Sequence, residues 1–324
     1  MVETLNWLLE ESNPSVRYWA LQGLLNKPRN DPDVLLAQKD LMSSEPINTI
    51  LKAQQIDGHW EDPKNMYLPK YTATTHSLLI LAELGASRIP AIERGIEHLF
   101  LYQRDSGHFF LDMPRTVKGK ASTVKDACCL DGNVLYYLNH FGYLDDPRTK
   151  KLLKFIVDYH SPESGWKCRS YPINTEGVFP KNCYMGAVKV LRALSMIPPE
   201  KQTSETHRIV EIEVEKVLQN YIYRYLRNID GSRKDKAGWK KFGFPLFYQS
   251  DALEVLDIIT KLGVHDNRMQ SAIDLVIKAR QPSGMWLLEN TFNGKMWVDL
   301  EEKGKPSKWI TLRAMRTLQR FNKN

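Results

Sequence analysis

The spacing of apolar and polar residues is helical along most of the chain. In stretches such as Ala91 to Tyr102 and Arg268 to Arg280, apolar residues recur every three or four positions and Lys, Arg and Glu occupy the other side. That pattern is typical of a helix that buries one face. Other stretches are apolar over much of their circumference, which predicts buried helices. These are residues 74–85, 131–142, 183–195, 250–263 and 307–321, and three of them close on Gly, a common helix stop.

A short motif of Gln, Gly and an aromatic residue lies between each amphipathic stretch and the apolar stretch that follows it. Its clearest copies begin at Gln55, Gln103 and Gln281, and reduced copies that keep Gly and Trp lie at 164–166 and 237–239. Gly permits a tight turn, Gln can bond free backbone groups at helix ends, and the aromatic side chain covers the junction. We therefore interpret the motif as structural and expect any chemistry to lie on the inner helices.

Residues 1–45 lack the motif but add helices of their own. Val2 to Glu11 and Ser15 to Leu25 predict a further hairpin, broken at Asn13-Pro14 with Ser15 available as a cap, and a connecting helix follows. With five motif-bearing repeats in residues 46–324, the chain contains about six hairpins, enough to close a ring with no exposed ends. The sequence thus predicts one all-α domain over residues 1–324, an α/α toroid of outer and inner helices.

Composition and charge narrow the range of partners. Lys and Arg outnumber Asp and Glu by 45 to 38, but they are scattered and form no basic stripe with exposed aromatic residues, so no nucleic-acid partner is expected.

Residues 1–11 are acidic where a signal peptide needs a positive flank, and no run of about 18 apolar residues occurs. We therefore expect a cytoplasmic protein without a transmembrane segment. Its four cysteines are expected to be free thiols or metal ligands rather than disulfides.

The motif also carries a family resemblance. Gln, Gly and Trp at this spacing between paired helices resemble the QW motif of the squalene cyclase and prenyltransferase β-subunit superfamily, over roughly residues 46 to 320. The segments 13–19, 243–248 and 306–313 look like a compact prokaryotic branch described as prenyltransferase or squalene oxidase repeat proteins. This resemblance implies the terpenoid cyclase-like α/α toroid and a central cavity for a hydrophobic, isoprenoid-like molecule. It does not by itself imply an activity, because fold does not determine function.

Of two sequence signatures known in this superfamily, one is missing from this sequence and the other is incomplete. The Asp-x-Asp-Asp acid of class II cyclases has no counterpart here. Protein prenyltransferases hold zinc with Asp-x-Cys and a later His, and Asp126-Ala-Cys128 matches the first pair, but no His follows in the later inner helices. Whether the protein is an enzyme therefore stays open at this stage.

The N-terminal ends of the inner helices are polar, and in a toroid they point into one mouth of the cavity. One hypothesis makes them a tetrahedral zinc site, the only cofactor that the sequence suggests. Its candidate ligands are Cys128 or Cys129, Cys183, His76, and Asp126 or Asp131. The alternative is that the thiols are small buried side chains, the aspartates are helix caps and His76 is a hydrogen-bonded core residue.

A second hypothesis is acid catalysis, in which a partly desolvated aspartate donates a proton to a hydrophobic substrate. The candidate catalytic residues are Asp131, Asp251 and Asp126, and the candidate substrate-binding residues are His76, Phe247, Tyr248, Trp309, Arg313 and Tyr184. Arg313 is suited to an anionic head group such as a diphosphate. The alternative is that residues 242–248 are only a hydrophobic connection.

The sequence favours a protein that binds a hydrophobic, isoprenoid-like small molecule in its central cavity, with transformation of that molecule an open question. The alternative, from another class, is a non-catalytic helical-repeat scaffold for protein partners.

Overall fold

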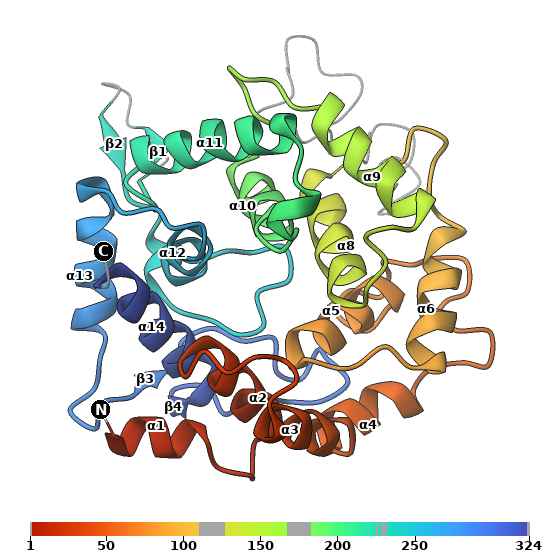
Figure 1. Cartoon of the computed structure of the whole chain (residues 1–324), viewed down its shortest axis with the longest axis horizontal. Helices are drawn as coiled ribbons and strands as arrows, with labels where there is room; N and C mark the ends of the chain where they lie inside the picture. The colour runs from red at the N-terminus through yellow and green to blue at the C-terminus, as the bar shows by residue number, and fades with distance from the viewer. Residues whose placement is uncertain (1, 110–126, 167–182, 225, 228–231, 323–324) are drawn as a thin grey trace. The chain divides into compact units, whose positions relative to one another are not determined.

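The computed structural model describes residues 2–109, 127–166, 183–224, 226–227 and 232–322, and the regular secondary structure of these residues is almost entirely helical (Figure 1). The helices are α1 (Val2–Leu8), α2 (Pro14–Gly23), α3 (Pro32–Met42), α4 (Glu45–Lys52), α5 (Thr74–Leu84), α6 (Pro90–Phe100), α8 (Cys128–His140), α9 (Pro147–Asp158), α10 (Tyr184–Leu194), α11 (Ser204–Gln219), α12 (Ala252–Lys261), α13 (Gln270–Lys278) and α14 (Lys308–Phe321). Short 3₁₀ turns lie at Pro199–Lys201, Ala237–Lys240 and Asn267–Met269. The predicted all-α class is confirmed.

Strand structure is confined, in this described part, to two short antiparallel pairs. Strand β1 (Leu226–Arg227) pairs with β2 (Arg233–Lys234), and β3 (Trp286–Leu287) pairs with β4 (Pro306–Ser307). The second pair places the last motif tryptophan directly beside the start of α14.

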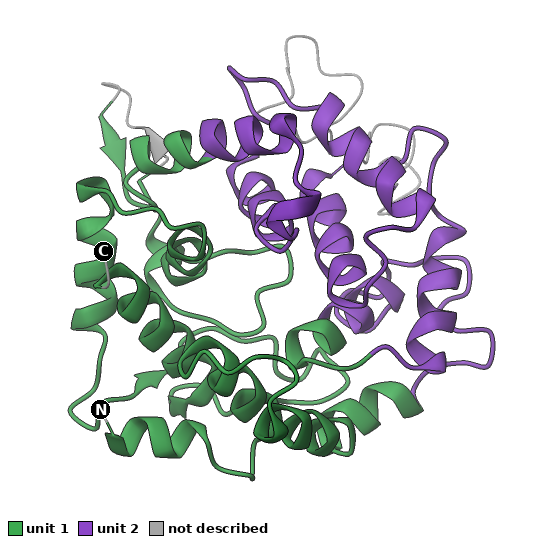
Figure 2. Cartoon of the chain, viewed as in Figure 1, with its two compact units in different colours: residues 1–52, 80–87, 214–324 green, residues 53–79, 88–213 purple. Residues whose placement is uncertain are grey.

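The described helices fall into two compact units, shown in Figure 2 and treated separately below. Unit 1 consists of residues 1–52, 80–87 and 214–324, and unit 2 of residues 53–79 and 88–213. Two of the unit boundaries fall within α5 and α11.

The apolar stretches of the sequence form the inner, buried helices. They correspond to α5, α8, α10, α12 and α14. In unit 2, α8 packs on α10 at very short range, because an added Cβ at Gly132 would lie 2.7 Å from the backbone of Lys189. Only glycine allows two helices to approach so closely at this point.

In unit 2, the glutamine of each of the first two motif copies bonds to backbone carbonyls of its own turn and of the next outer helix. The side-chain amide of Gln54 donates to the Gly58 carbonyl at 2.9 Å and to the Ala91 carbonyl, in the first turn of α6, at 2.8 Å. Gln103 repeats both bonds, to the carbonyls of Gly107 and Arg148, each at 2.8 Å. The motif glutamine of the first copy is therefore Gln54, and the assignment to Gln55 is wrong because its side chain only reaches the Ala53 carbonyl at 3.4 Å.

The motif also fastens itself to the inner helix that follows. The backbone N–H of Trp60 donates to Thr74 Oγ1 at 3.0 Å, and that of Trp286 donates to Thr311 Oγ1 at 3.0 Å. In the second copy the N–H of Phe109 donates to Asp131 Oδ1 at 2.9 Å. These three copies thus each use one buried polar side chain near the start of an inner helix.

In unit 1 the last repeat packs directly on the N-terminal hairpin. An added Cβ at Gly284 would lie 2.8 Å from Thr4 Oγ1 on α1, and α14 packs against α12, α2 and α1. An ion pair of 2.7 Å joins Lys308 to Glu10. Asn13 rather than Ser15 caps α2, since its Oδ1 accepts from the N–H of Val16 at 3.1 Å and Pro14 begins the helix.

A buried ion cluster joins α12 to α14 in the same unit. Asp257 accepts from Arg316 Nε at 2.7 Å, from a second Arg316 nitrogen, and from Arg320 Nη1 at 3.1 Å. The Asp257 side chain is 13% exposed. Burial tends to raise the pKa of this carboxyl, but the arginines outweigh it and hold the pKa at about 2.

The two adjacent glutamines give a direct stability test of the motif. We expect Gln54→Ala to lower the free energy of unfolding by about 1–3 kcal/mol, because two hydrogen bonds to backbone carbonyls are lost. Gln55→Ala, the matched control, is expected to change it by less than about 0.5 kcal/mol because that side chain is exposed. Urea unfolding of the two variants measures both values. Equal losses would contradict the assignment to Gln54.

Candidate ligand-binding site

The segment 242–248 of unit 1, which precedes α12, is held in place through its backbone. The N–H of Phe242 donates to Glu289 Oε2 and that of Gly243 donates to Asp251 Oδ2, each at 2.9 Å. Phe247 has a positive φ of 47°, a conformation that costs a bulky residue about 1–3 kcal/mol and is often found at functional sites. This connection is thus more tightly constrained than a simple hydrophobic linker requires.

Asp251 is the buried N-cap of α12. Its Oδ1 accepts from the N–H of Glu254 at 2.7 Å, its Oδ2 accepts from Gly243, and the residue is 1% exposed. Burial raises its pKa to about 6, although the charge of Arg313 and the two backbone donors act in the opposite direction. A carboxyl with such a pKa exchanges its proton near neutral pH, which is the property required of a general acid.

Trp309 and Arg313 lie one turn apart on α14 and face the same segment. The Trp309 ring stacks on the ring of Phe244, with centroids 4.2 Å apart and an interplanar angle of 12°. Arg313 Cζ lies 5.8 Å from the Phe244 centroid. Within the described residues, the buried Nη1 of Arg313 has no hydrogen-bond partner. A buried guanidinium N–H of this kind is suited to one more acceptor, such as an oxygen of a ligand.

The structure therefore brings several predicted residues together in unit 1. Asp251 lies within electrostatic range of Arg313, and Arg313 and Trp309 both contact Phe244. Phe247 is buried and packs edge-on against Phe292 at 5.1 Å, while Tyr248, the next residue, is half-buried. We call Phe244, Asp251, Trp309 and Arg313 the α12–α14 site.

His76 lies in unit 2, buried in an aromatic environment on α5. Its ring lies 4.7 Å from the ring of Tyr67 and 5.8 Å from that of Tyr71. Burial, with a smaller contribution from Lys70, lowers its pKa to about 3, so the imidazole is neutral. This environment fits a buried core position, and the ligand and substrate-binding roles of His76 stay predictions.

Asp131 has a structural bond of its own in unit 2. Its acceptance from Phe109 matches the bonds of Thr74 and Thr311 in the other copies, so this carboxylate takes a position that hydroxyls fill elsewhere. A small pocket is lined by Ala127, Cys128, Asp131, Phe155, Ile156, Tyr159 and Trp166. The catalytic role of Asp131 stays a prediction.

Of the proposed zinc ligands, the two thiols lie beside the same glycine. An added Cβ at Gly186 would lie 2.0 Å from Cys128 Sγ and 3.2 Å from Cys183 Sγ. Cys183 caps α10 by accepting from the N–H of Gly186, and half-buried Tyr184 begins that helix. Among the described residues, these thiols and His76 do not gather at metal-binding distance. Asp126 lies outside the described residues, so the proposed four-ligand zinc site stays a prediction.

Comparison with known proteins finds likeness at the level of structure only. No protein-family model matches the sequence, and no curated protein matches it. A protein from Actinoplanes is 12% identical, over 95% of this chain and 90% of that one, with a TM-score of 0.48. Type II terpene cyclase MstE from Scytonema, in complex with geranylgeranyl dihydroxybenzoate, is 12% identical over 99% of both chains, with a TM-score of 0.46.

The apo form of MstE is 11% identical, over 95% of this chain and 87% of that one, with a TM-score of 0.44. Fold does not determine function, so no residue role or substrate is transferred from these proteins. No helix in the described residues is both long and apolar enough to cross a membrane.

Two features could not be predicted from the sequence. Phe244 lies within the segment 242–248, but nothing in the sequence marks it as the ring that both Trp309 and Arg313 contact. The other is a cluster of Asp57, His59 and His98 in unit 2. The Asp-x-His spacing lies within the first motif copy, but nothing in the sequence pairs it with a residue of α6.

Proposed function

We propose that the α12–α14 site holds the polar end of a hydrophobic, isoprenoid-like small molecule, with Arg313 binding its oxygen atoms and Asp251 acting as a proton donor. The observation that carries the proposal is the buried Arg313 Nη1 without a partner among the described residues, next to stacked aromatic rings. Guanidinium groups bind phosphate and carboxylate oxygens strongly, and aromatic faces stabilise cationic character in a reacting chain. The protein is then expected to be cytoplasmic, with its hydrophobic ligand in the predicted central cavity.

The electrostatics of Asp251 support its role as an acid. A carboxylate offers about four lone-pair sites, so the two backbone donors leave room for a proton. Its pKa of about 6 keeps part of the population protonated near neutral pH. A helix cap that served only stability would gain from remaining ionised, whereas burial here disfavours the ionised form.

Binding of two probes that differ only in the head group tests the proposal. We expect geranylgeranyl diphosphate and geranylgeraniol to quench tryptophan fluorescence, since Trp309 lines the site. Arg313→Met is expected to weaken binding of the diphosphate by about 10- to 100-fold, because a charged hydrogen bond is lost, and to change binding of the alcohol little. Arg94→Met, which removes an exposed charge from α6, is the matched control and is expected to change neither.

Asp251→Asn separates binding from chemistry. Asparagine still caps a helix through its one oxygen, although its side-chain nitrogen cannot accept from the Gly243 N–H, so the variant is expected to fold with lower stability and to bind both probes, while any conversion seen by mass spectrometry of the wild-type reaction is lost. If the wild type bound neither probe and carried no lipid in an organic extract, the proposal would be wrong. The alternative of a non-catalytic scaffold would then be favoured.

A further inference from the structure

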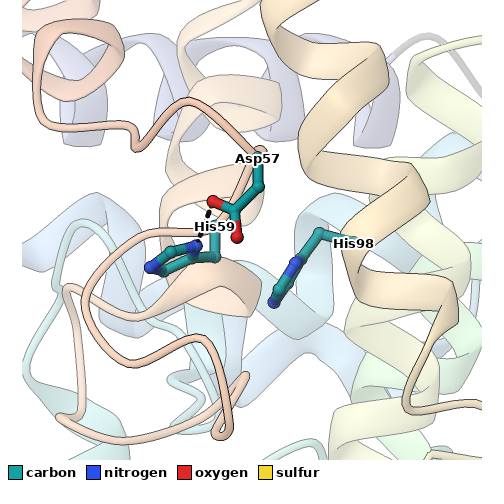
Figure 3. Close-up of side chains that lie close together, drawn as sticks. All are labelled: Asp57, His59 and His98. Carbon is teal, nitrogen blue, oxygen red and sulfur yellow. Dashed lines mark hydrogen bonds and ion pairs between the residues drawn. The ribbon is translucent and has the colours of Figure 1, made fainter.

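Three metal-ligating side chains converge in unit 2 (Figure 3), whereas the α12–α14 site belongs to unit 1. Asp57 and His59 belong to the first motif copy, between α4 and α5, and His98 lies in the last turn of α6. One ligand atom of each lies within 4.8 Å of the other two. Figure 3 shows the two imidazoles side by side with the carboxylate above them.

The two histidines are buried, and one of them offers a nitrogen with no partner. Each residue is 7% exposed, and their ring centroids lie 5.2 Å apart. His59 Nδ1 lies 2.5 Å from Asp57 Oδ1, whereas His98 Nε2 is buried without a hydrogen-bond partner among the described residues.

The second motif copy shows what the same positions look like without a ligand set. An added Cβ at Gly58 would lie 2.3 Å from the Arg94 carbonyl, and one at Gly107 would lie 2.3 Å from the Lys151 carbonyl, which aligns the two copies. His98 lies four residues after Arg94, and Phe155 lies four residues after Lys151.

In that alignment His59 corresponds to His108, and Asp57 to Ser106. His108 bonds Ser106 Oγ at 2.6 Å and stacks on Phe155, with centroids 4.6 Å apart. The second copy therefore has an apolar ring and a hydroxyl at the two positions where the first copy has the imidazole of His98 and the carboxylate of Asp57. The packing of the motif thus does not require these two ligand types.

We propose that Asp57, His59 and His98 form a binding site for a divalent transition-metal ion, with Zn²⁺ as the expected occupant. Tetrahedral zinc holds nitrogen and oxygen ligands at about 2 Å, which places the ligands about 3.3 Å from one another. Small side-chain rotations bring atoms that lie within 4.8 Å to that spacing. Because the Asp57 side chain is 54% exposed, water can reach a fourth position.

The bound ion would link the motif loop to α6. Gln54 already joins that loop to the first turn of the same helix, at Ala91, and a metal at His98 would add a second link near its other end. Zinc is then expected to raise the thermal midpoint of the wild-type protein, because a ligand that binds only the folded state stabilises it.

The full chain, purified without a histidine tag and stripped with a chelator, tests the site by calorimetric titration with ZnCl₂ and by the visible absorption of bound Co²⁺. We expect wild type to bind one equivalent at this site. His98→Phe, which copies the packing seen at Phe155, is expected to fold normally and to weaken that binding by roughly 100-fold or more, since even an outer-shell change costs up to about that much. His108→Gln, the matched control in the second copy, is expected to bind as wild type does.

Two results would overturn the proposal. One is a folded wild type that binds neither ion. The other is a His98→Phe variant with undiminished affinity whose metal is lost on Cys128→Ser or Cys183→Ser, because that would assign the ion to the thiols. A zinc-dependent rise in thermal midpoint that wild type shows and His98→Phe lacks supports the site independently of any activity.

Discussion

Asp257→Ala is expected to lower the free energy of unfolding by about 3 kcal/mol or more, because it leaves two arginines of α14 without their shared partner. Arg316 and Arg320 are 21% and 28% exposed, so water compensates in part and the lower end of the usual range applies. Urea unfolding at neutral pH measures the loss. Asp158→Ala, which removes an exposed partner of Lys154, is the control and is expected to cost less than about 0.5 kcal/mol.

The contribution of Asp257 also has a defined pH dependence. Its pKa is about 2 in the folded protein and near 3.8 in an unfolded chain, so the unfolded state binds more protons between these values. The stabilisation is therefore present above about pH 4 and is lost as the pH falls towards 2. We expect the stability difference between wild type and Asp257→Asn to be constant from pH 8 to 5 and to shrink below 4. A stability difference that grows on acidification would contradict the stabilisation of the ionised Asp257 carboxylate by the two arginines.

Gly58→Ala is expected to lower the free energy of unfolding by roughly 2–5 kcal/mol. Its φ of 97° disfavours any side chain, and the new Cβ would lie 2.3 Å from the Arg94 carbonyl, a backbone atom that cannot move without shifting α6. The left-handed conformation contributes about 1–2 kcal/mol and overpacking about 1–3 kcal/mol.

Gly142→Ala separates the two contributions to that loss. Gly142 has a similar positive φ of 78° but no atom within 4 Å of an added Cβ, so only the conformational cost of about 1–2 kcal/mol is expected. Thermal or urea unfolding of both variants gives the difference. Equal losses would show that the close approach to α6 contributes nothing.

The helices were predictable because their signals are local. The apolar stretch 131–142 corresponds to α8, Cys128–His140, and the predicted stop at Gly142 has the positive φ that a helix end requires. Burial on nearly all sides gives such stretches a composition that surface helices lack. The cap of α2 was predicted wrongly as Ser15, because the helix begins at Pro14 and the capping residue must precede it, which makes Asn13 the cap.

The motif glutamine could have been found from sequence with more attention to spacing. Gln103 lies four residues before Gly107, and Gln54 lies four residues before Gly58, whereas Gln55 lies three before it. The four-residue spacing lets one amide reach the glycine carbonyl and the next outer helix together. Aligning the copies on Gly instead of on the nearest Gln would have identified Gln54.

The sites were only half predictable, since they depend on which helices meet. Asp251 and Trp309 are candidates in the sequence because polar or aromatic residues at inner-helix ends can carry chemistry, and Arg313 is a candidate because a guanidinium suits an anionic head group. Their grouping follows from the packing of α12 on α14, which no local pattern encodes. His98 lies within an ordinary outer helix, and only its distance to His59 in three dimensions makes it a candidate ligand.

The contact of Gly284 with α1 has a consequence for the order in which the chain folds. Unit 1 combines residues 1–52 with residues 214–324, so its N-terminal hairpin must wait for helices that are synthesised last. At about 5–20 residues per second, this delay lasts roughly 10 seconds to a minute on the ribosome. During that time the apolar faces of α1 and α2 lack their α14 partner, which leaves this nascent hairpin open to aggregation and to chaperone binding.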